Sequence, residues 1–306
     1  MEPRLYEEYD AQNLVTLMNV VCQHKRYFVP VNIETINQTL RRGTRKRFGS
    51  LIVLGDERLL KGACHVFYDA SGQVGHMAYL LSLPGEEGTT WPLLLKAALK
   101  HLPRAIKISI GSPYTPLYHA VEGRIQPLWG STENLEVYSE DTLLIKFLAE
   151  NGFAPQEHYF TMSKALPAPV CAIGYPFEIL RGAECWYNAY SWYGRSSAEE
   201  FGLRNAALSV LVQKIGHVVE GHTAWYPLRA RARAALCDLE VAATRQGQGL
   251  GRALLTHTLE QMELDGYTSC ELFISPTQSP HAYALYHSSG FTIEATWYEM
   301  VYQINF

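Results

Sequence analysis

The segment Leu239-Glu-Val-Ala-Ala-Thr-Arg-Gln-Gly-Gln-Gly-Leu-Gly-Arg-Ala-Leu-Leu255 joins an apolar strand to an amphipathic helix through a short glycine-rich turn. Glycines at positions 247, 249 and 251 let the backbone of this turn approach a ligand closely. The helix that follows, from about Leu250 to Leu264, presents unpaired N–H groups and the positive end of its dipole at its first turn. The segment therefore predicts a site for an anion such as a pyrophosphate, bound without a metal.

Two other phosphate-binding motifs do not fit this turn. The dinucleotide fingerprint has the spacing Gly-x-Gly-x-x-Gly, whereas the turn has Gly247-x-Gly249-x-Gly251. A P-loop needs Gly-Lys followed by Ser or Thr, which the turn lacks. The spacing excludes both of these nucleotide-binding motifs.

The turn resembles the coenzyme A loop of the GNAT acetyltransferase superfamily, Gln/Arg-x-x-Gly-x-Gly/Ala, with Gln246, Gly249 and Gly251 at the matching positions. One strand later, Ala282-Tyr-Ala-Leu-Tyr286 and Gly290-Phe291 resemble the family's Ala-x-x-Leu-Tyr-x-x-x-Gly-Phe ending. Two motifs in the family's order make the resemblance specific. It implies acetyl-CoA as co-substrate, no metal, and direct transfer of the acetyl group without an acyl-enzyme.

The resemblance also assigns roles to residues. The pantetheine arm is expected to pair with the backbone of the strand before the loop and to enter between that strand and the next, which splay apart. Tyr286 is expected to be the acid that protonates the departing thiolate. Ser279 stands where the family often has Asn, followed by Pro280 as a helix start. The residues expected to bind the coenzyme are Leu239, Glu240, Val241, Gln246, Gly247, Gln248, Gly249, Leu250, Gly251 and Arg252.

No general base stands out. Asp238 and Glu240 project from one face of the strand before the loop, and His217 and His222 lie one strand earlier. We interpret these four residues as structural. Members of the family that the chain resembles often deprotonate the amine through ordered water, so a missing base does not argue against activity. Tyr286 has its own alternative, a purely packing role in the core.

Length, composition and charge limit the class of protein. A chain of 306 residues is about twice the usual domain size, and 47% hydrophobic against 18% charged residues is typical of a compact globular protein. The net charge of -4 argues against a nucleic-acid binder, despite the basic run Arg41–Arg47. Six dispersed cysteines without Cys-x-x-Cys are expected to be reduced. The chain has no long apolar run and no signal-peptide layout, so we expect a cytoplasmic protein that does not bind membranes.

An internal repeat divides the chain. A shift of 138 positions places Gly152-Phe153 on Gly290-Phe291 and Met162 on Met300. The repeat predicts two tandem GNAT-like domains, 1–165 and 166–306. The expected fold class is α/β (α+β), in which each domain has a mixed, mostly antiparallel sheet flanked by helices and a splayed strand pair that holds coenzyme A.

The first copy of the motif is degenerate. Glu86 stands where Gly247 is, Thr90 replaces Gly251, and Trp91-Pro92 alters the first turn of a helix expected over Leu93–Leu102. Adjacent carboxylates repel a pyrophosphate. We expect that the first domain does not bind coenzyme A and that it shapes the acceptor site or stabilises the second domain.

The acceptor is expected to be a primary amine of a small molecule, with a peptide or protein amine as a second choice. Two features that could contact the acceptor precede the third strand of the second copy: the aromatic run Trp186–Tyr193, and the set Arg229, Arg231 and Arg233. The three arginines would line one face of a strand, which suits an acidic acceptor or the coenzyme's phosphates, but we favour an exposed edge that discourages aggregation. The alternatives are a non-catalytic acetyl-CoA sensor or protein-interaction module, and transfer of a longer acyl group or to another acceptor. The oligomeric state has no signature in the sequence.

Overall fold

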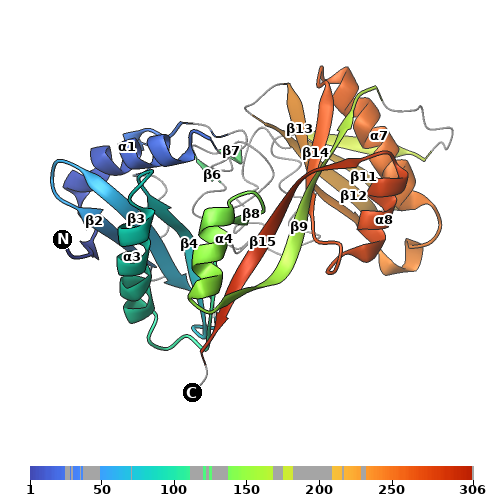
Figure 1. Ribbon diagram of the computed structural model, residues 1–306. Helices are drawn as coiled ribbons and strands as arrows, with labels where there is room; N and C mark the ends of the chain where they lie inside the picture. The colour runs from blue at the N-terminus through green and yellow to red at the C-terminus, as the bar shows by residue number, and fades with distance from the viewer. Residues whose placement is uncertain are drawn as a thin grey trace. The chain divides into compact units, whose positions relative to one another are not determined.

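In the computed structural model, helices and strands form two compact units (Figure 1). The basic run Arg41–Arg47, the aromatic run Trp186–Tyr193, Arg229 and Arg231 lie outside the described residues. The structure describes residues 1–24, 28, 30–34, 36, 49–69, 71–110, 120–121, 124–125, 137–167, 175–181, 209–215, 217–228 and 232–304.

The compact units do not follow a single cut between residues 165 and 166. Unit 1 contains Met1–Glu122, Glu133–His158 and Thr296–Phe306, and unit 2 contains Gly123–Thr132 and Tyr159–Ala295. Two long strands, β9 (Phe153–Ala165) and β15 (Thr292–Gln303), begin in one unit and end in the other. The sequence repeat and the compact units therefore divide the chain differently, and the boundary at 165/166 stays a prediction about the repeat.

Unit 1 contains an antiparallel meander followed by one parallel pair. Its helices are η1 (Glu8–Asp10), α1 (Ala11–Cys22), α3 (Glu87–His101) and α4 (Thr142–Glu150). Strand β4 (Val74–Ser82) lies parallel to β5 (Lys107–Ile110), which pairs antiparallel with the end of β15. The other strands of unit 1 that precede β9 in the sequence are β1 (Arg4–Leu5), β2 (Gly49–Gly55), β3 (Leu60–Tyr68), β6 (Ala120–Val121) and β8 (Val137–Tyr138). Strand β7 (Arg124–Ile125) belongs to unit 2.

Helix α3 packs on this sheet through Leu94, Leu95 and Ala98, and α4 adds Leu148 to the same core. Helix α3 begins at Glu87 and contains Pro92 in its second turn. The expected start near Leu93 is therefore wrong, because the residues before Pro92 already have helical geometry. Gly152, predicted to end α4, has a φ of +85°.

Unit 2 repeats the arrangement. Its sheet order is β9-β14-β13-β12-β11-β10, with the parallel pair β13 and β14 and otherwise antiparallel neighbours. Helices α7 (Leu250–Leu264) and α8 (Pro280–Ser288) share one core with the sheet. The remaining elements are β10 (Phe177–Arg181), β11 (Ser209–Ile215), β12 (Val218–Pro227), β13 (Arg233–Val241), η2 (Ala243–Arg245) and β14 (Ser269–Ile274).

The fold class is confirmed, with each unit a mixed sheet carrying helices. The apolar residues of Ile215–Val219 predict a single strand there. This prediction is wrong, since β11 ends at Ile215 and β12 begins at Val218. The apolar residues on both sides of this short turn make it read as a strand.

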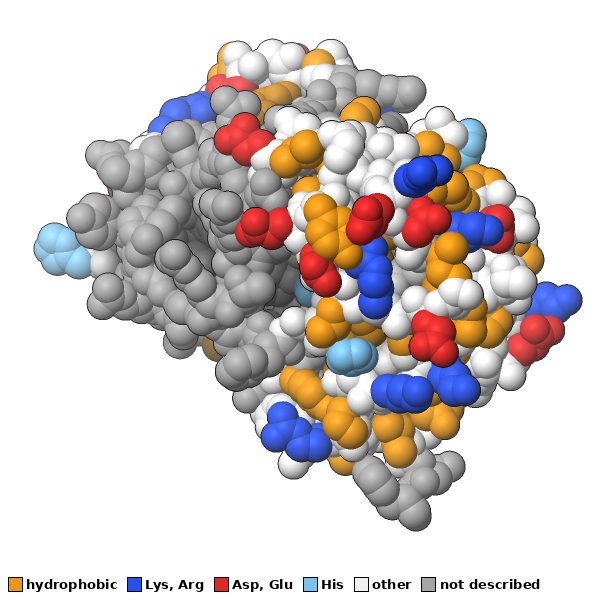
Figure 2. Space-filling view, turned by 90° about the vertical axis from the view of Figure 1, so that its left-hand side faces the viewer, with side chains coloured by type: hydrophobic (Ala, Val, Ile, Leu, Met, Phe, Trp, Pro, Cys, Tyr) orange, Lys and Arg blue, Asp and Glu red, His pale blue; other side chains and the backbone are white. Residues whose placement is uncertain are grey.

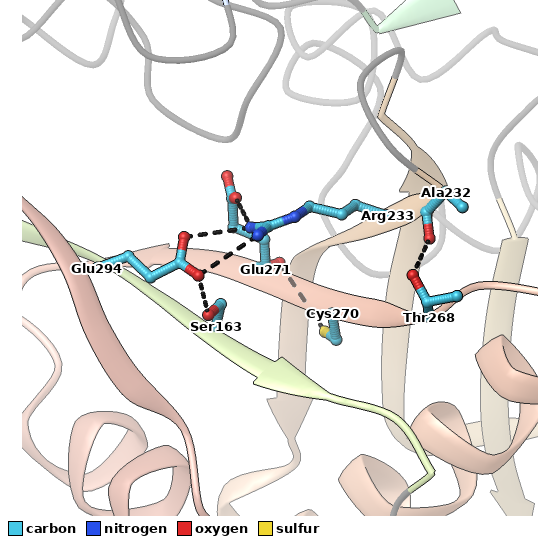
Figure 3. A network of polar contacts seen from close by, with 7 residues as sticks. All are labelled: Ser163, Ala232, Arg233, Thr268, Cys270, Glu271 and Glu294. Atoms are coloured by element: carbon cyan, nitrogen blue, oxygen red, sulfur yellow. Dashed lines mark hydrogen bonds and ion pairs between the residues drawn. The ribbon is translucent and has the colours of Figure 1, made fainter.

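Arg233 lies inside the sheet rather than at an exposed edge, since β13 pairs with strands on both sides. Its guanidinium is 3.0 Å from the carboxylate of Glu271 and 3.1 Å from that of Glu294, and Ser163 donates to Glu294 (Figure 3). The Glu271 side chain is fully buried. The interpretation of Arg233 as part of an exposed edge is therefore wrong, because its guanidinium is paired with two carboxylates of unit 2.

Arg233→Met is expected to lower the free energy of unfolding by about 3–5 kcal/mol, because it takes the cation away from a buried carboxylate. Urea unfolding of the purified variant measures the loss. Arg233→Met combined with Glu271→Met should recover much of it, and Glu294→Gln, at a side chain 28% exposed, should cost less than Arg233→Met. An unchanged urea midpoint in Arg233→Met would contradict the structural role.

Charged side chains are interspersed on the face of the molecule turned to the viewer in Figure 2, where acidic, basic and apolar groups alternate. Among the described residues of this face, Lys and Arg do not form a continuous stripe. In the described part of the chain, no helix is both long and apolar enough to cross a bilayer.

Candidate functional site

Strands β13 and β14 run parallel only at their beginning. Their ladder pairs Arg233 with Ser269, Ala234 with Cys270 and Ala235 with Glu271. Beyond this point β13 continues to Val241 and β14 to Ile274, but no further residue of β13 pairs with a residue of β14. From Leu236 onwards the backbone of β13 therefore has no paired residue on β14, as the splayed pair requires.

The glycine turn follows directly after this separation. Gly247 and Gly249 have φ values of +75° and +84°, a left-handed conformation that favours glycine. A Cβ atom built on either residue meets no atom within 4 Å, so the space above the turn is open. Gly249 is the N-cap of α7, and no side chain caps that helix. This open space lies beside the uncapped N–H groups and the positive end of the dipole of α7, so it can accommodate a pyrophosphate.

The expected coenzyme ligands divide into backbone and side-chain groups. Leu250 is buried in the core, so only its backbone faces the turn. Gln246 donates from its side chain to the carbonyl of Val241 at 3.1 Å, and Gln248 donates to that of Thr244 at 2.9 Å, which stiffens the turn. Arg252 is exposed and donates to Ser288 at 3.1 Å.

The other expected ligands belong to the strand and the start of α7. Leu239 and Val241 pack against the core of unit 2 with their side chains, and Glu240 is exposed between them. A Cβ on Gly251 would be in ordinary contact with Val241 and Leu285 at 3.6 and 3.7 Å. The structure thus brings the ten expected residues together in one continuous strand, turn and helix end.

The corresponding turn in unit 1 is already occupied by acidic side chains. Glu86 is the N-cap of α3, with Glu87 in the first turn. The Glu86 carboxylate is 2.8 Å from the ammonium of Lys61, and Thr90 is buried. Two carboxylates at a helix N-terminus oppose the binding of another anion there.

Tyr286 lies on α8 and is buried, with its ring centroid 5.6 Å from that of Phe291. Burial raises its pKa above the usual value, and electrostatic interactions with Asp238, Cys270 and Cys237 act in the same direction. These three residues come from the two strands that separate. Tyr286 therefore keeps its proton at neutral pH, as an acid must. Ser279 is the N-cap residue of α8, and its side chain makes no cap hydrogen bond.

The structure brings into contact two residues whose proximity the sequence does not predict. His222 on β12 lies 2.6 Å from Asp238 on β13, measured from Nε2 to Oδ2. Burial lowers the pKa of His222 to about 4, and burial together with Glu240 raises the pKa of Asp238 to about 7. The contact is thus a hydrogen bond between partners that share a proton, rather than an imidazolium–carboxylate ion pair. His217 lies exposed in the hairpin turn.

Potential ligand atoms of His222, Asp238 and Glu240 lie within 4.8 Å of one another, one such group among the described residues. Two ligands of a tetrahedral zinc ion lie about 3.4 Å apart, given metal–ligand bonds of about 2.1 Å. The 2.6 Å separation of His222 and Asp238 is a hydrogen-bond length instead. We therefore interpret this group as a proton-sharing cluster.

Cys237 stands beside Asp238 without the properties of a nucleophile. Its thiol donates to the carbonyl of Ala224 at 3.3 Å. Although the residue is exposed at the surface, the protein atoms that enclose its sulfur raise its pKa to about 12. A thiol that stays protonated is a poor nucleophile, which agrees with direct transfer.

Residues 177–291 match the model of the acetyltransferase (GNAT) family. No curated protein sequence matches the chain significantly. The match begins after the first copy of the repeat and covers the turn, α7 and α8.

Solved structures resemble the chain over almost its full length. A tandem GNAT protein from the clavulanic acid biosynthesis pathway superposes with a TM-score of 0.69 at 14% identity, covering 99% of this chain and 97% of the other. A GCN5-related N-acetyltransferase from Sphaerobacter thermophilus gives 0.62 at 14% identity, with 98% and 95% covered.

A further relative is longer than this chain. It is a fungal multi-domain GH3 β-N-acetylglucosaminidase with a GCN5-related glucosamine N-acetyltransferase region, and it has a TM-score of 0.69 at 14% identity. The alignment covers 98% of this chain but only 38% of the fungal protein. Such identities establish the fold alone. Residues 177–291 thus match the GNAT family, and the chain as a whole has the fold of tandem GNAT structures.

Proposed function

We propose that the second copy, residues 166–306, is an acetyl-CoA-dependent N-acetyltransferase that acetylates a primary amine of a small molecule. One observation carries the proposal: an uncapped helix N-terminus with open glycines stands where β13 parts from β14. Bound there, acetyl-CoA supplies the thioester carbon that the amine attacks and the sulfur that leaves.

The residues of unit 2 have separate tasks in this proposal. The N–H groups of the turn and of the first turn of α7 bind the pyrophosphate. The backbone of Leu239, Glu240 and Val241 aligns the pantetheine arm along the free edge of β13. Tyr286 holds the proton that the departing sulfur needs, and its burial keeps that proton in place.

A small acceptor suits the acidic character of the site. Asp238 and Glu240 face the region beside the splayed strands, where a protonated amine is attracted rather than repelled. The fungal relative carries a glucosamine N-acetyltransferase region, so an amino sugar belongs among the first acceptors to test. Tyramine and 1,4-diaminobutane represent aromatic and dicationic amines.

The experiment follows free coenzyme A release, using acetyl-CoA with glucosamine, tyramine or 1,4-diaminobutane, and identifies the product by mass spectrometry. An N-acetylated amine formed at catalytic rates supports the proposal. Tight acetyl-CoA binding without transfer to any primary amine, in a screen extended to peptide amines, would favour the sensor alternative instead.

Calorimetric titration with acetyl-CoA is expected to give one site per chain. The acidic N-terminus of α3 opposes a second site in unit 1, since Glu86 and Glu87 occupy it. Removing these charges with Glu86→Gln and Glu87→Gln together should leave the stoichiometry at one, because the turn before α3 has one left-handed glycine, Gly85, where the turn before α7 has two. A stoichiometry of two in the wild type would contradict the degenerate first copy.

A further inference from the structure

A β-bulge in β13 places an acidic side chain at the point of separation. The register pairs Ala224 with Asp238 but Trp225 with Leu236, so Cys237 is an extra residue in β13. Leu236 and Leu239 both pack toward the α7 core although they are three residues apart. The extra residue therefore turns Asp238 to the opposite face, a common use of bulges beside active sites.

His222 holds Asp238 in this position from the neighbouring strand. The register sets His222 opposite Glu240 and diagonal to Asp238, which gives the 2.6 Å contact. The His222 side chain is only 4% exposed, whereas 28% of the Asp238 side chain remains accessible. The pair thus has one fixed member and one member that a ligand can reach.

The titratable groups around the pair lie on three elements. Glu240 on β13 raises the pKa of Asp238, in addition to the larger effect of burial, to about 7. Tyr286 on α8 and Cys270 on β14 both have pKa values raised by burial, and so does Cys237 within the bulge. Below about pH 7 Asp238 is therefore mostly protonated, and above it Asp238 is a carboxylate that can accept a proton.

We propose that the hydrogen-bonded pair of Asp238 and His222 is the general base for the acceptor amine, acting together with Tyr286 as the acid. The inference rests on the proposed function. The structure contains both groups that the proton transfers need. The accessible carboxylate of Asp238 is hydrogen-bonded to the buried imidazole of His222, and the charge of this carboxylate raises the pKa of the buried Tyr286.

The protons and bonds balance as follows. The ammonium gives one proton to the Asp238 carboxylate, and the resulting amine forms the C–N bond while the C–S bond breaks. The leaving sulfur takes the proton of Tyr286, and the second proton lost by the nitrogen restores Tyr286. Asp238 then releases its proton to water, so one proton appears in solution per turnover.

Two measurements test the pair. First, NMR titration of the protein labelled with ¹³C at its Asp carboxyls should show one carboxyl with a midpoint near pH 7, and Asp238→Asn should remove that signal. Second, kcat/KM for the best amine of the panel should rise tenfold per pH unit below about pH 7 and level off above it. Asp238→Asn should lower the plateau at least about 100-fold and abolish the inflection, while the Kd for acetyl-CoA stays close to that of the wild type.

Glu240→Gln provides the matched change of charge. Removal of this neighbouring carboxylate should lower the pKa of Asp238 and move the inflection to lower pH, which a merely structural role would not do. The inference is overturned if Asp238 titrates near its usual value of about 4, or if Asp238→Asn retains the wild-type pH profile. In both cases a wild type that still acetylates the amine leaves the proposed function intact, whereas a wild type without transfer refutes the function itself.

Discussion

Gly249→Asp is expected to weaken acetyl-CoA binding about 1,000-fold. A carboxylate about 4 Å from a bound phosphate charge costs about 4 kcal/mol at an effective dielectric constant of 20. The fold should survive, because Asp tolerates the left-handed φ of +84° and is a preferred N-cap residue. Isothermal titration calorimetry measures the loss of binding, and thermal unfolding checks the fold.

Two controls separate the charge from the change of shape. Gly249→Asn has almost the same shape without the charge, so the difference between Asn and Asp gives the electrostatic part. Gly88→Asp makes the same substitution in the first turn of α3, where a Cβ also meets nothing within 4 Å, and should leave binding unchanged. Binding of acetyl-CoA by Gly249→Asp at wild-type affinity would place the site elsewhere.

The turn and helix of this site were predictable because their signals are local. Strand β13 ends at Val241 and α7 spans Leu250–Leu264, as the glycine spacing and the apolar periodicity predict. The positive φ values of Gly247 and Gly249 follow from the same short segment. Here each residue needs only its near neighbours to define the conformation.

The compact units depend on long-range pairing, which local patterns do not encode. Strand β9 ends beside β14, whereas the end of β15 pairs with β5, far away in sequence. Periodicity identifies β9 as a strand but says nothing about its partner. For this reason the repeat indicates two copies while the compact units exchange chain segments between them.

The acid–base cluster was missed for a related reason. The three-residue step from Leu236 to Leu239 is the sequence signal of the bulge, because strict alternation would need two. Only the register with β12 then selects His222 rather than His217 as the partner of Asp238. The prediction of an exposed edge at Arg233 was wrong for the same reason, since its two carboxylate partners lie on other strands.

Tyr286→Phe is expected to lower kcat by about 100- to 10,000-fold, the usual contribution of a general acid. The substitution removes one hydroxyl and keeps the ring that packs against Phe291. At the repeat-related position in unit 1, Leu148 is fully buried in the core, so packing at this place does not require a phenol. The Kd for acetyl-CoA should change little, because we propose that the coenzyme's phosphates bind at the turn and the start of α7.

Tyr283→Phe is the matched control on the same helix. Tyr283 packs on Phe160 with a centroid separation of 5.8 Å, and loss of its hydroxyl should leave kcat unchanged. Steady-state kinetics with calorimetry on both variants separates turnover from binding. Wild-type kcat in Tyr286→Phe would make Tyr286 a packing residue, and the proton for the leaving sulfur would then have to come from water. A loss of kcat with unchanged Kd would instead mean that the hydroxyl acts only after acetyl-CoA is bound, as expected for a group that stabilises a departing thiolate.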